Sequence, residues 1–255
     1  MKIIFLHIPK TAGQSVHAAL INAYGPEAVC PARSNTQLYN MTISELNRYQ
    51  VFSGHLDWSL LDCIRGEKYI FTILREPMER ILSFYFYLRE DAKKKSPDEL
   101  KKPSRQGMRA ALEMTPNEYF YQSNRFRGFI DGHYDNFYTY YFAGRVFQGR
   151  SRFFRKIKQG SLTKSQLIDL AKQNMDELND VYNFADIGKA FDKISEISGK
   201  NILNSDSYRR NVNTAIDEKD RTQKLIALGA DTKTLTKIKD FCELDYELLN
   251  KYFQR

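Results

Sequence analysis

Early in this 255-residue chain, a strand pattern passes through a tight turn into a helix pattern, which restricts the folds that the chain can adopt. Residues 2–8 (KIIFLHI) form a short apolar run typical of a buried strand. Small residues make up the turn 10–13, and we expect a helix from Gln14 or Ser15 that stops before Gly25. The apolar face of that helix holds Val16, Ala19, Leu20 and Ala23.

The same alternation continues through the first third of the chain. Residues 51–53 read as a second strand that ends at Gly54 and His55, and residues 69–74 (YIFTIL) as a third. Thr42 and Glu45 form a capping box for a helix over 42–49. Pro77 suits the first turn of a helix that reaches about Arg89. The inner stripe of this last helix is Met78, Ile81, Leu82, Tyr85 and Leu88. Strands that alternate with helices at this spacing predict a parallel sheet covered by helices.

The rest of the chain is less regular. We expect an exposed lysine-rich loop over 91–105, a last strand over 184–187 with a helix over 189–197, and a polar loop over 201–214. Two helices, over 218–228 and 233–253, close the chain. The simplest organisation is one domain over 1–255 with a loop-rich insertion at about 91–160. The lysines of the loop are interpreted as a solvated charge run, with guidance of an anionic acceptor as the alternative.

Composition narrows the class of protein. With 42% hydrophobic and 27% charged residues, the chain is neither fibrous nor disordered. Its three cysteines, Cys30, Cys63 and Cys242, form no close pair, which favours a reducing compartment. The first apolar run is too short for a signal peptide, and no run could span a bilayer. These observations predict a soluble cytoplasmic protein, or a catalytic domain of a longer one. The net charge of +8 favours anionic partners without choosing one.

The turn HIPKTAGQS, residues 7–15, has the pattern of an anion site. A strand that turns tightly into a helix directs backbone N–H groups and the positive helix end at one point. Lys10 adds a charge, and Thr11 and Ser15 add hydroxyl groups. The common nucleotide loop GxxxxGK[ST] is absent. The alternative is a turn that needs its glycine for geometry alone.

A second pattern lies in residues 73–87 (ILREPMERILSFYFY). Arg75 follows the end of the third strand, and ligands of open parallel sheets bind outside the carboxyl ends of strands. A guanidinium there can bind a phosphate through two N–H groups. Ser83 lies two turns into the next helix, away from its apolar stripe, so it faces a ligand or is an ordinary surface serine.

Together the two stretches resemble the sulfotransferases that use 3′-phosphoadenosine 5′-phosphosulfate. They are most similar to the carbohydrate branch, which includes heparan sulfate 2-O-sulfotransferase and its bacterial relatives. HIPKTAGQS resembles that branch's 5′-phosphosulfate loop, (R/H)xPKTAxxS, and LREPMERILSFYFYLR resembles its 3′-phosphate motif, (L/I)R(D/E)PxERxxSxYxxLR. Weaker similarities lie at residues 53–55, 135–144, 184–192 and 209–213.

The resemblance implies a P-loop-kinase-like α/β fold in three layers, with a central parallel sheet flanked by helices. It implies that Lys10 contacts the sulfate-bridging oxygen and takes part in catalysis. Arg75 and Ser83 would bind the 3′-phosphate, helped by Arg210. His55 matches the catalytic base, although the heparan enzyme carries His-Gly-His where this chain begins with Ser53. The residues implied for the 5′-phosphate are Thr11, Ala12, Gly13, Gln14 and Ser15.

This reaction would be an in-line displacement that leaves adenosine 3′,5′-bisphosphate. A neutral imidazole at His55 would take the proton of the acceptor hydroxyl, and Lys10 would offset charge on the leaving phosphate. No Asp/His cluster has metal-ligand spacing, so no metal is predicted. His7 and His17 are assigned to packing or support, and for His133 contact with an acceptor is left open.

Two other functions fit part of the sequence. A small-molecule or nucleotide kinase with a divergent phosphate loop would need ATP and magnesium. A basic nucleic-acid-binding module would need a reader motif, and none is evident. We therefore predict a hydroxylated acceptor, a glycan or glycolipid, and no nucleic acid or integral membrane segment.

Overall fold

The computed structural model describes residues 1–121, 126–200, 202 and 218–253. The chain divides into two compact units. The sheet unit holds residues 1–75, 145–147 and the described part of 172–215, and the helical unit holds the remaining described residues. The division falls inside helix α11 (Lys164–Met175), and the expectation that residues 1–255 form one domain stays a prediction.

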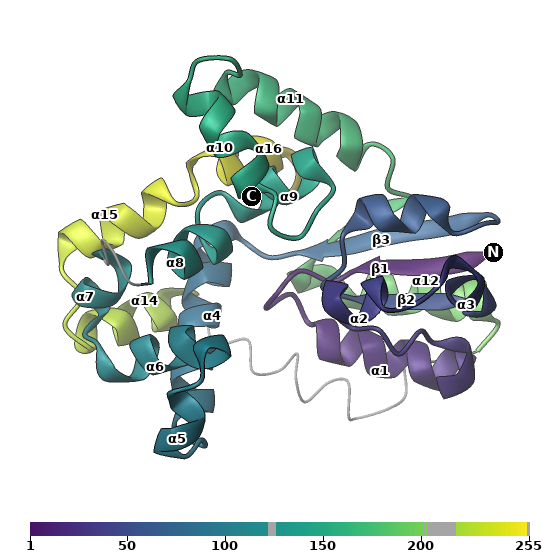
Figure 1. Cartoon of the computed structure of the whole chain (residues 1–255), viewed down its shortest axis with the longest axis horizontal. Coiled ribbons are helices and arrows are strands. Elements are labelled where there is room, and N and C mark those ends of the chain that lie inside the picture. Colours follow the sequence, from purple (N-terminus) through teal and green to yellow (C-terminus); the bar gives the residue numbers. More distant parts are fainter. Residues whose placement is uncertain (122–125, 201, 203–217, 254–255) are drawn as a thin grey trace. The chain divides into compact units, whose positions relative to one another are not determined.

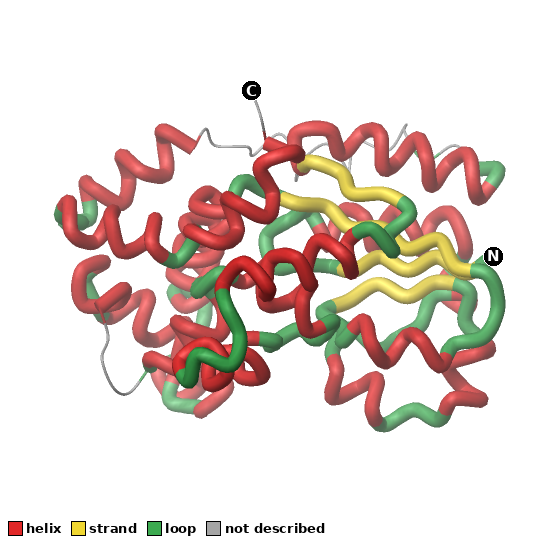
Figure 2. The backbone as a smooth tube through the Cα atoms, turned by 90° about the horizontal axis from the view of Figure 1, so that it is seen from above, coloured by secondary structure: helices red, strands yellow, loops and turns green. Residues whose placement is uncertain are grey.

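A four-stranded parallel sheet forms the centre of the sheet unit, in the order β2-β1-β3-β4 (Figures 1 and 2). Strand β1 pairs with both β2 and β3, so that Leu6 lies beside Gly54 on one side and Thr72 on the other. The Thr72 hydroxyl donates to the Leu6 carbonyl at 2.8 Å, which ties these two strands together at their carboxyl ends. The predicted α/β fold with a central parallel sheet flanked by helices is confirmed. The strands are β1 (Lys2–Leu6), β2 (Val51–Gly54), β3 (Lys68–Leu74) and β4 (Asp180–Asn183).

Helices α1 and α12 pack together against one face of this sheet (Figure 1). The predicted stripe of α1 is buried there with Ile3 and Phe5 of the central strand and Phe191 of α12. Burial of a valine, leucine, isoleucine or phenylalanine side chain stabilises by about 1.5–3 kcal/mol, so Val16 and Leu20 supply most of the energy that docks this helix. The helical elements of the unit are α1 (Gly13–Tyr24), η1 (Pro26–Ala28), α2 (Asn35–Tyr39), α3 (Ile43–Arg48), η2 (Trp58–Cys63), η4 (Phe184–Asp186) and α12 (Ile187–Ser198).

The helical unit is built around α4 (Pro77–Ala92). All five predicted stripe residues of α4 are buried in one apolar cluster with residues of α6, α7, α8, α14 and α15. The remaining elements of the unit are α5 (Pro97–Leu100), η3 (Pro103–Arg105), α6 (Gln106–Glu113), α7 (Pro116–Tyr121), α8 (Arg127–His133), α9 (Phe137–Gly144), α10 (Arg150–Lys158), α14 (Glu218–Ala227), α15 (Thr232–Asp240) and α16 (Glu243–Phe253), with α11 (Lys164–Met175) shared between the units.

Three expectations about secondary structure are wrong. Residues 91–160 are not loop-rich, because helices α5 to α10 occupy much of them, and Ser96 and Glu99 form a capping box for α5. The last strand is 180–183 rather than 184–187, because a sheet-edge strand tolerates the half-buried polar sequence DVYN. The helix expected over 233–253 is two helices.

Asn136 explains the break between α15 and α16. Its backbone N–H donates to the Phe241 carbonyl at 2.7 Å, and its side-chain oxygen accepts from the Leu244 N–H at 2.7 Å. In a continuous helix, the Phe241 carbonyl and the Leu244 N–H would form hydrogen bonds within the helix, but here both bond to Asn136. The expected loop over 201–214 lies outside the described residues except for Ile202.

None of the helices in the described ranges has both the length and the apolar character needed to cross a membrane. The cytoplasmic location stays a prediction.

Asp245 joins α16 to the start of α9. Its side chain is 1% exposed and accepts from the Tyr138 N–H, the Thr139 N–H and the Thr139 hydroxyl. We expect Asp245→Ala to lower the free energy of unfolding by roughly 2–4 kcal/mol, because three donors lose a buried acceptor. Urea denaturation measures this, with the exposed Asp240→Ala of α15 as the control. Equal effects of the two variants would contradict this account.

Candidate active site

The carboxyl ends of all four strands bring chemically important residues to one edge of the sheet. His7 follows β1, His55 follows β2, Arg75 follows β3 and Phe184 follows β4. The chain leaves β1 for β2 on one side and then crosses to β3 on the other, so β1 is the point where the strand order reverses. Ligands of open parallel sheets bind outside the strand ends at this point.

The loop between β1 and α1 has a strained backbone. Lys10 and Ala12 have φ angles of 72° and 63°, in the left-handed region that non-glycine residues rarely adopt. Such positions turn successive N–H groups toward one side, which is the geometry of an anion nest. Thr11 is fully buried, and its hydroxyl donates to the Ile8 carbonyl at 2.8 Å. This buried hydrogen bond therefore holds the loop, although the backbone at Lys10 and Ala12 has an unfavourable conformation.

The N-terminus of α1 has no side-chain cap. Ala12 is the N-cap residue and offers no oxygen to the N–H groups of the first turn, which lack acceptors within the helix. Helix α3, by contrast, is capped by Thr42 and Glu45 as predicted. The Ser15 hydroxyl oxygen is buried, and no hydrogen-bond partner for it lies among the described residues. An uncapped helix end with an additional buried hydroxyl group suits a phosphate.

Gly13 is required by the ring of His7. A Cβ atom on Gly13 would lie 1.7 Å from His7 Nε2 and 1.9 Å from His7 Cε1. The φ angle of Gly13 is not in the left-handed region. Gly13 is therefore needed because the His7 ring lies so close to its Cα, and not because of the turn. The turn geometry that we considered for the glycine belongs instead to Lys10 and Ala12.

His55 is held in one tautomer. Its Nδ1 lies 2.8 Å from the His7 carbonyl oxygen, and because a carbonyl only accepts, Nδ1 carries the proton. The neutral ring then keeps its lone pair on Nε2. Burial, and secondarily the nearby Arg33 guanidinium, lower the pKa of His55, whereas the His7 carbonyl opposes the shift. His55 is therefore neutral at pH 7, as a proton acceptor must be.

Among the described residues, two aromatic rings contact His55. The ring centroid of His7 lies 4.3 Å away with a 27° interplanar angle, and that of Phe147 lies 5.0 Å away. Phe147 reaches this place because Asp57 accepts its backbone N–H at 2.7 Å. Asp57 also accepts from Asn35 at 2.7 Å, so it orients neighbouring groups. Phe147 was missed because no local pattern connects it with residue 55.

Segment 145–147 is anchored in the sheet unit by Arg145. Its guanidinium pairs with Asp62 at 2.7 Å and Glu177 at 3.4 Å, and lies 4.5 Å from the centre of the Trp58 ring. This anchor places Phe147, two residues later, beside the imidazole.

Arg75 contacts the loop directly. It is 8% exposed, and its Nη1 donates to the Lys10 carbonyl at 3.3 Å. Its guanidinium also lies 4.4 Å from the centre of the Phe184 ring. The first and second sequence patterns therefore meet at the edge of one sheet, as the prediction of a shared ligand requires.

The other predicted residues are placed as follows. Ser83 lies on α4 in the helical unit and is buried, so the ordinary surface serine is wrong. Arg210 lies outside the described residues. Gln14 is exposed at the start of α1. Ser53 is fully buried in β2 and is not placed to act as a base.

A model of the sulfotransferase family matches residues 1–252, nearly the whole chain. The chain belongs to this family. No curated protein and no solved structure matched it. The protein is therefore a transferase of sulfuryl groups, and the sheet edge described above is the candidate active site of this sulfotransferase.

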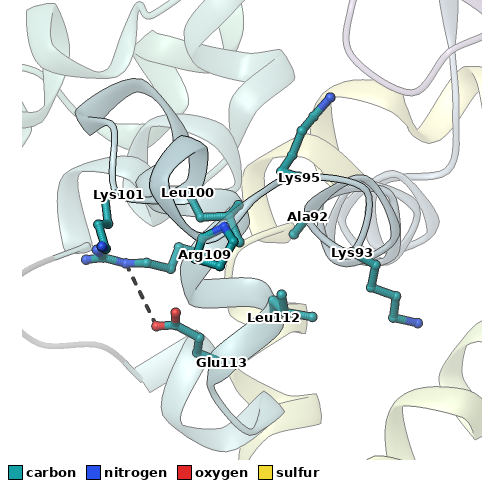
Figure 3. A pocket seen from close by; sticks show the side chains of 9 residues that line it. Ala92, Lys93, Lys95, Leu100, Lys101, Arg109, Leu112 and Glu113 are labelled. Atoms are coloured by element: carbon teal, nitrogen blue, oxygen red, sulfur yellow. Dashed lines mark ion pairs between the residues drawn. The ribbon is translucent and has the colours of Figure 1, made fainter.

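The lysine-rich part of this sulfotransferase forms a separate hollow in the helical unit. A cavity of about 430 Å³ lies among the end of α4, α5 and α6, with Ala92, Leu100 and Leu112 beside basic side chains (Figure 3). Each basic side chain has a carboxylate three or four residues away. The pairs are Lys93 with Glu90 (2.6 Å), Lys95 with Asp91 (4.0 Å), Lys101 with Asp98 (2.9 Å) and Arg109 with Glu113 (3.8 Å). These pairs favour the solvated charge run over guidance of an acceptor.

Among the described residues, no three His, Cys, Asp or Glu side chains lie close enough together to hold a metal ion.

The close contact between Gly13 and the His7 ring leaves no room for a side chain at position 13 of the sulfotransferase. Gly13→Ala should destabilise it by about 1–3 kcal/mol, because the methyl group overlaps the imidazole. Adding His7→Ala should recover most of that loss, which urea denaturation of both single variants and the double variant will measure. Additive effects of the two substitutions would contradict the contact.

Proposed function

We propose that this sulfotransferase moves a sulfuryl group from 3′-phosphoadenosine 5′-phosphosulfate to a hydroxyl group of a carbohydrate, with His55 as the base. The observation that carries the proposal is the shared sheet edge. An uncapped helix N-terminus, the Arg75 guanidinium in contact with its loop, and the neutral imidazole of His55 follow three adjacent strands.

The residues of the loop fit the phosphate groups of this donor. The strained backbone at Lys10 and Ala12, the open first turn of α1 and the buried Ser15 hydroxyl together offer N–H and O–H donors to an anion. A strained loop persists only where its surroundings over-determine it, and such loops cluster at ligand sites. We assign the 5′-phosphate to Thr11, Ala12, Gly13, Gln14 and Ser15, and the bridging oxygen to Lys10.

Arg75 is proposed to bind the 3′-phosphate. The Phe184 ring and the Lys10 carbonyl hold its guanidinium beside the loop. A planar guanidinium held by a ring loses less rotational freedom on binding an anion than a mobile side chain does. Ser83 and Arg210 are proposed for the same phosphate on the resemblance alone.

The bound donor would supply an activated sulfuryl group. The residues of the protein would then stabilise the negative charge of the donor and accept one proton from the acceptor hydroxyl. The Lys10 ammonium group offsets negative charge on the departing phosphate. Nε2 of His55 accepts the proton of the acceptor hydroxyl, and the His7 carbonyl, which accepts Nδ1–H, stabilises the imidazolium that forms. Lys10, Arg75 and the helix end provide the neutralising charge, so the proposal includes no metal.

The acceptor is proposed to be a glycan or glycolipid. Support comes from the two motifs that resemble the carbohydrate branch. Transfer of labelled sulfate from the donor across a panel of sugars, glycolipids and small alcohols tests this part, and transfer only to non-carbohydrate hydroxyls would contradict it.

Nucleotide binding distinguishes this function from that of a kinase. Adenosine 3′,5′-bisphosphate without metal should raise the melting temperature, because a ligand at 100 times its Kd stabilises by about 2.7 kcal/mol. Arg75→Ala should weaken this binding far more than binding of the analogue without the 3′-phosphate, and the exposed Arg65→Ala should weaken neither. Stronger stabilisation by ATP with magnesium would favour the kinase, and equal weakening of both nucleotides would make Arg75 structural.

The base assignment has its own test. His55→Gln should lower turnover by roughly 10²–10⁴-fold while binding of adenosine 3′,5′-bisphosphate stays nearly unchanged. The half-buried His17→Gln on α1 is the matched control and should turn over normally. Because burial lowers the pKa of His55, the acidic limb of kcat/KM should lie below pH 6.5, where the base becomes protonated. Normal turnover of His55→Gln would remove His55 from this role.

A further inference from the structure

His7 makes three contacts at the strand end. The side chain is 8% exposed, and its ring is stacked on Phe5 at 5.5 Å and on His55 at 4.3 Å between centroids. The same ring lies so close to Gly13 that no side chain fits there. His7 therefore touches both the start of α1 and the proposed base.

The backbone and the side chain of His7 act on His55 in different ways. The carbonyl fixes the tautomer, because it accepts Nδ1–H at 2.8 Å. One hydrogen bond leaves the imidazole free to tilt, since the outer torsion of histidine has a broad minimum. The stacked ring of His7 restricts that tilt, and it also keeps water from one part of the His55 ring.

The charge state of His7 suits this role. Burial lowers its pKa well below 6.5, and the neighbouring groups His55, Arg33 of the segment before α2, His17 of α1 and Lys10 of the loop act in the same direction. Among the described residues, the charged and polar groups that act on the pKa of His55 are the His7 carbonyl and the Arg33 guanidinium. A neutral His7 ring adds no repulsion to the imidazolium that forms on His55, and it does not compete for the proton.

We propose that His7 is a positioning residue, whose imidazole holds the ring of His55 at a fixed tilt and distance from the first turn of α1. The inference rests on the proposed role of His55 as the base. It assigns to this chain a second histidine at the site, which follows the end of β1, whereas His55 follows the end of β2.

Three variants test the proposal: His7→Ala removes the ring, His7→Phe keeps a flat ring, and His17→Ala removes a nearby half-buried histidine that is not stacked on His55. Nitrogen-detected imidazole NMR reports the tautomer and pKa of His55 without any acceptor, and steady-state kinetics report turnover. In wild type, His55 should be the Nδ1–H tautomer with a pKa below 6.5.

His7→Ala should bring the pKa of His55 closer to 6.5, because the ring that shields it from water is gone. Turnover should fall roughly 10- to 100-fold, the scale for small misplacement of a reacting group, with binding of adenosine 3′,5′-bisphosphate changed less than about 3-fold. The acidic limb of kcat/KM should move up in pH with the same shift. His7→Phe should restore the pKa and most of the turnover, and His17→Ala should leave turnover unchanged.

An unchanged His55 pKa in folded His7→Ala would overturn the proposal, even if His7→Phe does not fold. So would His7→Phe that folds and is as slow as His7→Ala. Failure of the proposed function shows differently, as no sulfate transfer by wild type or no response to adenosine 3′,5′-bisphosphate. The NMR comparison then still decides whether His7 positions His55.

Discussion

Strand β1 lies between β2 and β3 in parallel register, and every part of the candidate site depends on this arrangement. Parallel neighbours end at the same edge, so the residues that follow three separate strands are brought together without any long-range loop. The Thr72 hydroxyl bond to the Leu6 carbonyl ties β3 to β1 at that edge. A Cβ on Gly54 would lie 2.7 Å from the Arg33 carbonyl oxygen, so this glycine lets the segment before α2 approach the end of β2.

The site combines a rigid base with a strained anion loop. Burial keeps the His55 imidazole neutral, which prepares it to accept a proton, but burial also makes the imidazolium more costly. The His7 carbonyl offsets part of that cost. In the loop, two left-handed residues cost of order 1–3 kcal/mol each, and the buried Thr11 hydroxyl bond and the Arg75 contact hold them. An anion bound at the helix end would offset the cost of this backbone conformation.

Local signals in the sequence were sufficient for much of the fold. The capping box at Thr42 and the stripe of α4 depend on neighbours three and four residues away, so they could be predicted.

The site was predicted only in part. Lys10, Arg75 and His55 follow the ends of parallel strands, so the sheet topology predicts that they lie close together. Phe147 lies beside His55 because its N–H donates to Asp57, a residue 90 positions away in the sequence, and no local pattern predicts this bond. The role of Gly13 was likewise hidden, because it depends on where the His7 ring lies. The break between α15 and α16 depends on Asn136, which no helix pattern around 241 includes.

A crystal structure of the protein with adenosine 3′,5′-bisphosphate would show whether the loop and Arg75 bind one nucleotide. We expect one phosphate against the N–H groups of the first turn of α1 and the other within hydrogen-bonding distance of the Arg75 guanidinium, with Nε2 of His55 facing the 5′ end of the nucleotide. A nucleotide bound away from both the loop and Arg75 would contradict this expectation.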